Sequence, residues 1–205
     1  MTEVWTKFVQ LSTIKPVTKK EKVLLPEWSK AYFASGCFWC VEAVFESVKG
    51  VKETVSGYSG GVLKNPTYEQ ICTGKLQHAE AVEVYYDSAV VTYETLLKVF
   101  FGSHDPTTAN RQGPDRGPQY RSIVFYQDAQ EKTIAEKYIK TLKDSGSFGA
   151  PIVTELLAFE IFYKAEEYHQ DYERKHPDNG YIQSVSIPRL NRFKAKFPEL
   201  LKKEH

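Results

Sequence analysis

The sequence predicts an α+β fold, a two-layer sandwich in which helices pack on a mixed β-sheet. Apolar residues recur at strand spacing in some segments and at helix spacing in others, and a β-α-β order occurs twice with long connections. The chain has 205 residues, enough for one domain with an adequate core. No internal repeat is evident, and no apolar run approaches the ~18 residues of a membrane span.

Composition excludes several classes of protein. With 27 Lys and Arg against 26 Asp and Glu, the chain has no basic stripe for nucleic acid. Residues 1–22 lack the continuous apolar stretch of a signal peptide, and three cysteines are an odd count for a disulfide framework. We therefore expect a cytoplasmic protein that binds neither nucleic acid nor membrane.

Three regions are expected along the chain. Residues 1–28 form an N-terminal arm, because charged residues and prolines interrupt any period there. Residues 29–180 form the catalytic domain. Residues 181–205 form a polar, proline-punctuated and cysteine-free C-terminal tail that wraps the domain.

Residues 31–34 are apolar and predict a short strand. A helix follows over 39–49, because apolar residues lie at i, i+3, i+4 and i+7 from Val41, and Gly50 supplies its end. Residues 51–58 and 79–87 alternate as strands, and between them Thr67 caps a short helix over 68–72.

The second half continues the alternation. A helix begins at Thr92 and ends at Gly102, and 122–127 is a strand. Asp128 begins a helix over 129–143 through a capping box. Residues 152–163 are expected as one long strand, and 165–175 as a helix.

Cys37 lies where the first strand turns into the first helix. Helix N-termini carry free N–H groups and partial positive charge, both of which favour a thiolate. Gly36 allows the turn to be sharp. A lone cysteine is more often a small buried apolar residue. A second cysteine, Cys40, three residues on shifts the interpretation toward redox chemistry.

Glu80 is the second candidate residue. On a strand period it shares a face with Val82 and Val84, so burial should raise the pKa of its carboxyl. A protonated Glu near pH 7 is a general acid. The alternative is a solvated Glu at a strand end, or one paired with Lys.

Residues 103–121 form the longest irregular stretch, and long loops in compact domains are often functional. The alternative is a solvated surface loop. Its polar residues suggest the wall of a site: Arg111, Asp115, Arg116, Tyr120 and Arg121.

A series of short motifs runs in order through residues 30–180. They are Gly36-Cys37-Phe38-Trp39 with Glu42, Gly57-Tyr58-Ser59-Gly60-Gly61, Pro66-Thr67-Tyr68-Glu69-Gln70-Ile71-Cys72-Thr73-Gly74, His78-Ala79-Glu80-Ala81-Val82, His104-Asp105-Pro106, Arg111-Gln112-Gly113 with Asp115, Gln119-Tyr120-Arg121-Ser122 and Tyr168-His169-Gln170-Asp171-Tyr172. Together these motifs resemble the class A peptide-methionine sulfoxide reductases. A single one would be a weak signal, whereas the ordered set is highly specific.

The resemblance implies a ferredoxin-like core and reduction of the S epimer of methionine sulfoxide, free or in proteins. By similarity, the Cys37 thiolate attacks the sulfoxide sulfur and Glu80 protonates the oxygen, leaving a sulfenic acid on Cys37. The other matching positions have supporting roles. Tyr68 and Tyr120 hydrogen-bond the oxygen, Phe38 and Trp39 hold the S-methyl group, and Asp115 and His169 line or support the site.

The chain departs from the family in how the sulfenic acid is resolved. Many members carry resolving cysteines in the C-terminal tail, and this tail has none. Cys40, Cys72 or an external thiol remains available; we favour Cys40, whose Cys-x-x-Cys spacing can close a disulfide. Thioredoxin or another dithiol would then reduce it, with no bound cofactor. The resemblance further implies a monomer that repairs oxidised proteins under oxidative stress.

Two rival functions use the same residues. A general thiol–disulfide oxidoreductase of the thioredoxin type would need Cys37 and Cys40 but not Glu80 or the tyrosines. A zinc-binding module would use Cys37, Cys40, Cys72 and His78, although their spacing is not that of a known closed site.

Overall fold

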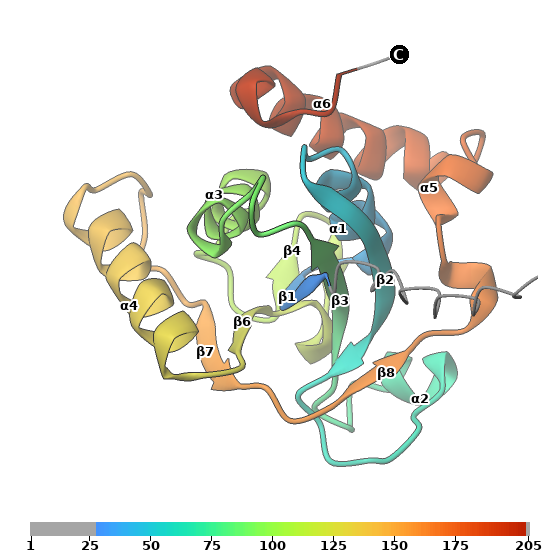
Figure 1. Cartoon of the computed structure of the whole chain (residues 1–205). Coiled ribbons are helices and arrows are strands. Elements are labelled where there is room, and N and C mark those ends of the chain that lie inside the picture. The colour runs from blue at the N-terminus through green and yellow to red at the C-terminus, as the bar shows by residue number, and fades with distance from the viewer. Residues whose placement is uncertain (1–27, 204–205) are drawn as a thin grey trace, which may run out of the picture.

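The computed structural model describes residues 28–203, so nearly all of the expected N-terminal arm, 1–28, lies outside it. Its centre is a six-stranded mixed sheet with the order β7-β6-β1-β3-β2-β8 (Figure 1). Only the β6–β7 pair is parallel. The strands are β1 Ser29–Ser35, β2 Val51–Ser59, β3 Ala79–Tyr86, β6 Ser122–Tyr126, β7 Glu155–Ala158 and β8 Phe162–Lys164.

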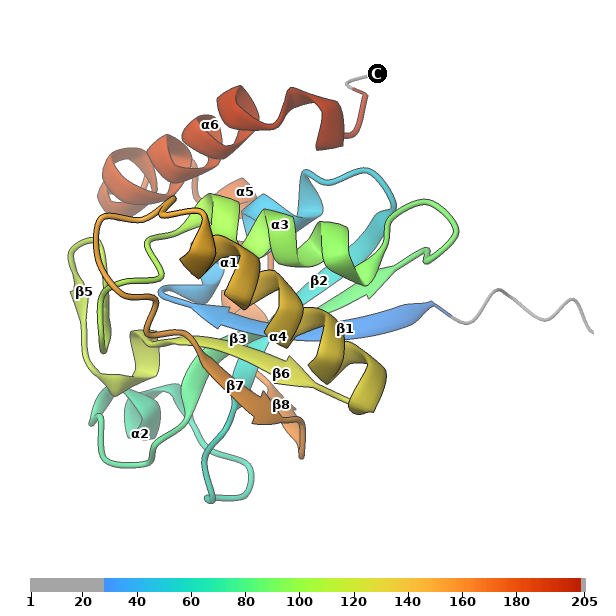
Figure 2. The ribbon, with the colours of Figure 1, turned by 90° about the vertical axis from the view of Figure 1, so that its left-hand side faces the viewer.

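Helices pack on one face of this sheet, which confirms the predicted two-layer α+β sandwich. Figures 1 and 2 show them on the same side of the strands. The core between the layers contains stacked rings: Phe33 of β1 lies 5.0 Å from Phe45 and 5.3 Å from Phe100, measured between ring centroids. The helices of this layer are α1 Phe38–Glu46, α3 Tyr93–Ser103 and α4 Ala129–Asp144, and α6 Ile187–Lys196 packs on α1 and α3.

The expected strand over 152–163 is wrong as a single element. The structure divides it into β7 and β8, which lie at opposite edges of the sheet. Six flat strands would span about 24 Å edge to edge, whereas the four residue steps from Ala158 to Phe162 reach at most about 14 Å. The sheet must therefore curl so that its edges approach, and the 155–164 segment crosses the concave side (Figure 1).

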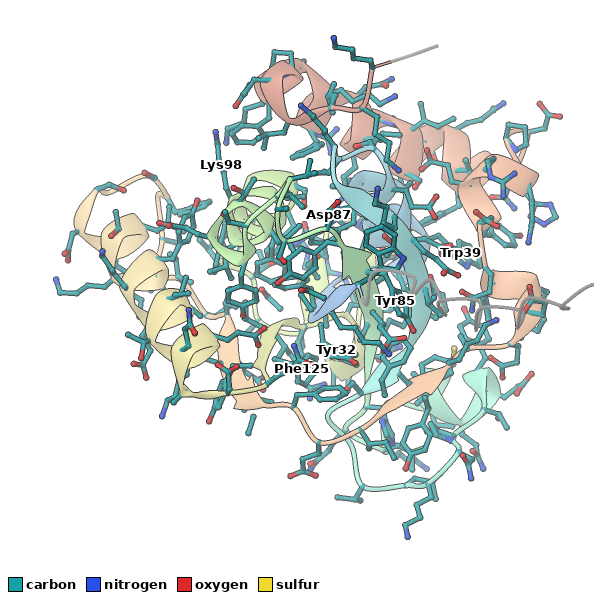
Figure 3. The ribbon with its side chains drawn as sticks, in the orientation of Figure 1. Tyr32, Trp39, Tyr85, Asp87, Lys98 and Phe125 are labelled. Atoms are coloured by element: carbon teal, nitrogen blue, oxygen red, sulfur yellow. The ribbon has the colours of Figure 1, made fainter. Side chains whose placement is uncertain are left out.

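A second, smaller apolar cluster fills that concave side. Tyr32 stacks on Phe159 with 3.7 Å between ring centroids, and Phe125 and Ile123 are buried beside them. Figure 3 shows Tyr32 and Phe125 on this side, away from α1. Both faces of the sheet are thus covered, one by helices and one by the crossing segment.

The helix expected over 165–175 is also wrong in extent. Only a 3-10 turn, Glu167–His169, and the four residues of α5, Tyr172–Lys175, are helical. Gln170 interrupts the helix because its side chain bonds the backbone of Ser56 and Ala165, and Asp171 takes a left-handed φ of 55°. The break fixes this segment against β2.

The tail contains regular structure that the sequence analysis did not predict. A π-helical turn, Ile182–Ser186, runs into α6, and a 3-10 turn, Pro198–Leu200, follows. Phe193 is buried where α6 packs against α1 and α3. Lys98 of α3 lies 2.9 Å from Glu199, and Figure 3 shows it on the side of α3 toward α6.

The 103–121 stretch is tied down by short elements. β4 Arg111–Gln112 pairs with β5 Asp115–Arg116, and a 3-10 turn covers Pro118–Tyr120. Between β2 and β3, α2 Tyr68–Cys72 begins with the predicted Thr67 cap. The remaining predicted strands and helices occur within a few residues of their expected ends. Across residues 28–203, no helix has the length and apolarity needed to cross a membrane.

Candidate active site

The turn from β1 into α1 brings the first candidate residue to one end of the sheet. Gly36 has φ +88°, and a Cβ placed there would lie 2.6 Å from Cβ of Gln112 in β4. Only glycine fits this close approach. Cys37 follows as the N-cap residue of α1, as the sequence predicted. The two-stranded β4–β5 excursion therefore packs directly over the turn.

Cys37 and Cys40 form a buried thiol pair, 7% and 2% exposed. Burial raises the pKa of Cys37. A hydrogen bond from Cys37 lowers the pKa of Cys40 to about 6, aided by the charge of Arg189 and opposed by burial. The prediction that the helix start makes Cys37 the resting thiolate is therefore not supported. The first-turn N–H of Phe38 donates to Glu80, and of the two thiols Cys40 is the one whose pKa is lowered.

Glu80 extends from β3 to the start of α1. Its Oε2 accepts a hydrogen bond from the Phe38 backbone N–H at 3.0 Å, and its side chain is buried. Burial raises the pKa of the Glu80 carboxyl to about 8, while the Phe38 hydrogen bond opposes the rise. The predicted direction of this shift is confirmed. At pH 7 the carboxyl is mostly protonated and can donate a proton.

Tyr68 and Tyr120 approach Glu80 from separate elements. Tyr68 begins α2, and Tyr120 ends the 3-10 turn after β5. Burial raises the pKa of both phenols, and the charge of Glu80 adds to it in each case. Both hydroxyls therefore remain protonated donors throughout the neutral range. Tyr120 also responds to the charges of Asp115 and Cys37, which places it on the same site.

Aromatic rings form an apolar wall beside the carboxyl. Phe38 is buried, and its ring centroid lies 4.9 Å from that of His169. The His169 centroid lies 4.4 Å from that of Tyr68. Trp39 is only partly buried and stacks on Tyr172 with 3.7 Å between ring centroids. The two adjacent aromatics thus have different environments. Phe38 belongs to the interior, and Trp39 lies between α1 and the 165–175 segment.

His169 and Asp115 support this wall. The Trp39 indole N–H donates to Nδ1 of His169 at 3.1 Å, which leaves the ring proton on Nε2. Burial lowers the pKa of His169, so the ring is neutral at pH 7. Asp115 accepts a hydrogen bond from the Tyr181 hydroxyl at 2.6 Å, and burial raises the pKa of its carboxyl. The structure thus brings all the predicted site residues into one region.

Sequence reasoning missed the contribution of the tail. The Tyr181 hydroxyl lies 3.8 Å from Cys40 Sγ, and Ser186 and Arg189 are buried near the same thiol. The spacing of Leu190, Phe193 and Phe197 is helical, and this signal could have revealed α6.

The sequence analysis also missed Glu166. This carboxylate accepts hydrogen bonds from the Tyr68 backbone N–H and the Tyr58 hydroxyl.

The zinc hypothesis is not supported by the arrangement of its residues. Cys72 is exposed on α2, and the Nε2 of His78 contacts the Leu63 carbonyl. Within residues 28–203, the only His, Cys, Asp or Glu side chains close enough to share a metal ion are Glu42, Glu46 and Asp171. The two oxygens of Glu42 already accept hydrogen bonds from the Ser56 hydroxyl and the Asp171 backbone N–H.

Comparison with known proteins gives a consistent result. The family described as peptide methionine sulfoxide reductase matches residues 29–201. A peptide methionine sulfoxide reductase MsrA of Acinetobacter baumannii is 50% identical over 173 residues, covering 84% of this chain and 98% of the relative.

Solved structures agree with the sequence matches. Reduced Mxr1 of Saccharomyces cerevisiae superposes with a TM-score of 0.71 at 32% identity, covering 78% of this chain and 92% of that one. Mxr1 in complex with Trx2 gives a TM-score of 0.52 at 25% identity, covering 75% and 91%.

Proposed function

The chain belongs to the peptide methionine sulfoxide reductase family and reduces methionine sulfoxide, and from this premise we propose which residues carry out each step. The substrate is the S epimer, free or within oxidised proteins. Phe38 and Trp39 provide the apolar surface for its S-methyl group, backed by His169. This surface adjoins the Glu80 carboxyl through the Phe38 backbone.

The sulfoxide oxygen lies toward Glu80, Tyr68 and Tyr120. All three are proton donors at pH 7, because burial raises the pKa of each. Hydrogen bonds from the tyrosines stabilise negative charge as it develops on the oxygen, and Glu80 transfers its proton there. Oxygen can then leave the sulfoxide sulfur in protonated form.

Cys37 is the nucleophile. Its proton passes to the Cys40 thiolate across the hydrogen bond between the two thiols, and the Cys37 sulfur attacks the sulfoxide sulfur. The oxygen, protonated by Glu80, then moves to Cys37 as the S–O bond of the substrate and the new bond between the two sulfurs break, which leaves a sulfenic acid on Cys37. Methionine, reduced by two electrons, departs. Glu80 and the thiol pair thus handle the two protons of the reaction separately.

Cys40 resolves the sulfenic acid. Cys40 gives up the proton that it took from Cys37, and its sulfur attacks the Cys37 sulfur to form an S–S bond. The hydroxyl of the sulfenic acid takes that proton and leaves as water. Cys40 is one helical turn from Cys37, whereas Cys72 is exposed on a separate helix. A dithiol donor then reduces the disulfide. The solved complex of the similar Mxr1 with Trx2 supports thioredoxin as this donor.

The observation that carries the proposal is the 3.0 Å hydrogen bond from Phe38, the residue after the nucleophile, to a buried carboxyl that holds its proton. The test is activity on separated S and R epimers of methionine sulfoxide, for the wild type and for Cys37→Ser. We expect the wild type to reduce only the S epimer and Cys37→Ser to reduce neither. Equal activity on both epimers, or activity without Cys37, would contradict the assignment.

The reaction implies a role in repairing oxidised proteins under oxidative stress, in a reducing cytoplasm that supplies thioredoxin. We further propose that the protein works as a monomer without a bound cofactor, because the residues of the proposed site come from one chain. Size-exclusion chromatography and the activity of metal-free protein with a dithiol donor test these two points.

A further inference from the structure

Arg189 of α6 is a buried cation. It is 6% exposed and donates three hydrogen bonds: Nε to the Ser103 carbonyl at 2.7 Å, one terminal nitrogen to the Ser35 carbonyl at 2.9 Å and the other to the Ser35 hydroxyl at 3.1 Å. All three acceptors are neutral. Among residues 28–203, no carboxylate forms an ion pair with this guanidinium. Burying a charge without a counter-ion is costly, so an anion nearby would be strongly favoured.

The guanidinium lies beneath the turn that carries the nucleophile. Ser35 ends β1 two residues before Cys37, and a Cβ on Gly36 would lie 3.6 Å from an Arg189 terminal nitrogen. The same tail places Tyr181 3.8 Å from Cys40 Sγ and Ser186 near it. The cysteine-free tail therefore surrounds the Cys40 thiol with polar groups.

Two neutral hydroxyls, those of Tyr181 and Ser186, also lower the pKa of Cys40. Each also has a shorter hydrogen bond elsewhere, because Tyr181 donates to Asp115 and Ser186 donates to Glu173. Cys37 and Glu80 also lie near Cys40 and carry their protons at pH 7, because burial raises the pKa of each. Asp115 is a carboxyl on which the charge of Arg189 also acts, and it accepts the hydrogen bond from Tyr181. His104, which also lies near Arg189, has its pKa lowered to about 3 by burial and is neutral. Arg189 is thus the positive charge that acts on Cys40 within the described residues.

We propose that Arg189 is a positioning residue whose guanidinium is the counter-ion of the Cys40 thiolate, so that the tail promotes disulfide formation without contributing a cysteine. This inference rests on the proposed role of Cys40. It is consistent with the low pKa of Cys40, about 6, to which the charge of Arg189 contributes. The position of the guanidinium is fixed independently by its bonds to Ser35 and Ser103.

Two steps of the cycle benefit from this charge. When the Cys40 thiolate attacks the Cys37 sulfenic acid, a larger thiolate fraction at neutral pH speeds formation of the S–S bond and release of water. When the dithiol donor attacks Cys37, the residue with the larger exposed fraction of this buried pair, Cys40 is the leaving thiolate. A leaving thiol of lower pKa departs faster. The donor's second thiol then releases Cys37, and the donor becomes a disulfide.

The test compares Arg189→Met, Arg189→Lys and Arg192→Met in a Cys72→Ser background. Arg192 is an exposed cation on the same helix and is the matched control for lost charge. Two quantities are measured against pH: the ultraviolet absorbance of the thiolate, and the rate of disulfide formation after one equivalent of methionine S-sulfoxide. For Arg189→Met we expect disulfide formation at pH 7 to slow about three- to tenfold. The midpoint of the pH dependence of this rate should rise by about one pH unit.

Arg189→Lys keeps the charge and should restore the wild-type pH profile even if it lowers stability. Arg192→Met should match the wild type. An unchanged profile in Arg189→Met, or a wild-type protein with no thiolate below about pH 8, overturns the inference. If Arg189→Met fails to fold, Arg189→Gln keeps an amide donor toward Ser35 and carries the same prediction. If the wild type forms no Cys37–Cys40 disulfide, the proposed function fails; if it forms one regardless of charge at 189, only this inference fails.

Discussion

At the scale of single residues, the site depends on which groups hold a proton at neutral pH, and this is set by burial and by hydrogen bonds. Glu80 and Cys40 have pKa values shifted in opposite directions, the carboxyl to about 8 and the thiol to about 6. Glu80 is therefore an acid and Cys40 a thiolate at the same pH. Groups with pKa values moved toward neutrality are those suited to general acid and nucleophilic catalysis.

Replacing the acid should therefore remove most of the activity. Glu80→Gln keeps an oxygen to accept the Phe38 N–H but has no acidic proton, so we expect kcat/KM to fall about 10²- to 10⁴-fold. Glu83→Gln is the matched control, because Glu83 lies on the same strand but bonds Lys30, Tyr32 and Tyr85 instead. The prediction is contradicted if Glu80→Gln keeps activity within about twofold of Glu83→Gln.

The same carboxyl should make stability depend on pH. Its folded-state pKa is raised from 4.5 to about 8, so between these values the folded state holds a proton that the unfolded chain has lost. The unfolded state then binds fewer protons, and the free energy of unfolding falls as pH rises through this window. We measure the free energy of unfolding in urea at pH 5 and pH 8.5. From the lower to the higher pH, the stability of Glu80→Gln relative to the wild type should rise by about 1–3 kcal/mol. An equal difference at both pH values would contradict the burial argument.

At the scale of elements, local patterns identified most helices and strands. The Asp128 cap accepts the Glu131 backbone N–H at 2.8 Å, as its spacing predicts, and Thr67 caps α2. The failures have long-range causes. The 152–163 run is divided because the sheet curls, and the 165–175 helix is broken because the Gln170 side chain bonds β2. Neither the curl of the sheet nor the Gln170 hydrogen bonds can be predicted from the spacing of apolar residues within one segment.

The tail helix should be an integral part of the fold rather than an appendage. Phe193 is 1% exposed beneath α6, so Phe193→Ala should lower the free energy of unfolding by about 3–4 kcal/mol through lost burial and a cavity. Asn191→Ala, at an exposed position of the same helix, should change it by less than about 0.5 kcal/mol. Denaturant unfolding measures both. A small effect of Phe193→Ala would show that α6 is not part of the cooperative core.

At the scale of the whole molecule, the site forms where separate segments meet. The β1–α1 turn brings the thiols, β3 the carboxyl, α2 and the 118–120 turn the tyrosines, and the 167–169 turn the histidine. The tail closes the far side with Tyr181 and Arg189.

The candidate site residues could be predicted from the sequence more readily than the hydrogen bonds and charges that set their pKa values. Residue patterns pointed to Cys37 and Glu80, and the family resemblance pointed to Tyr68 and Tyr120; the structure brings these residues into one region. The sequence could not show that Phe38's N–H goes to Glu80 rather than to the thiol, or that Arg189 lies near Cys40. Those features depend on contacts between residues 42 or more positions apart along the chain.

The most direct test is to map the disulfide by peptide mass after one turnover of methionine S-sulfoxide without reductant. We expect a Cys37–Cys40 link with Cys72 still a free thiol. A Cys37–Cys72 link, or a sulfenic acid that persists on Cys37 while Cys40 remains reduced, would contradict it.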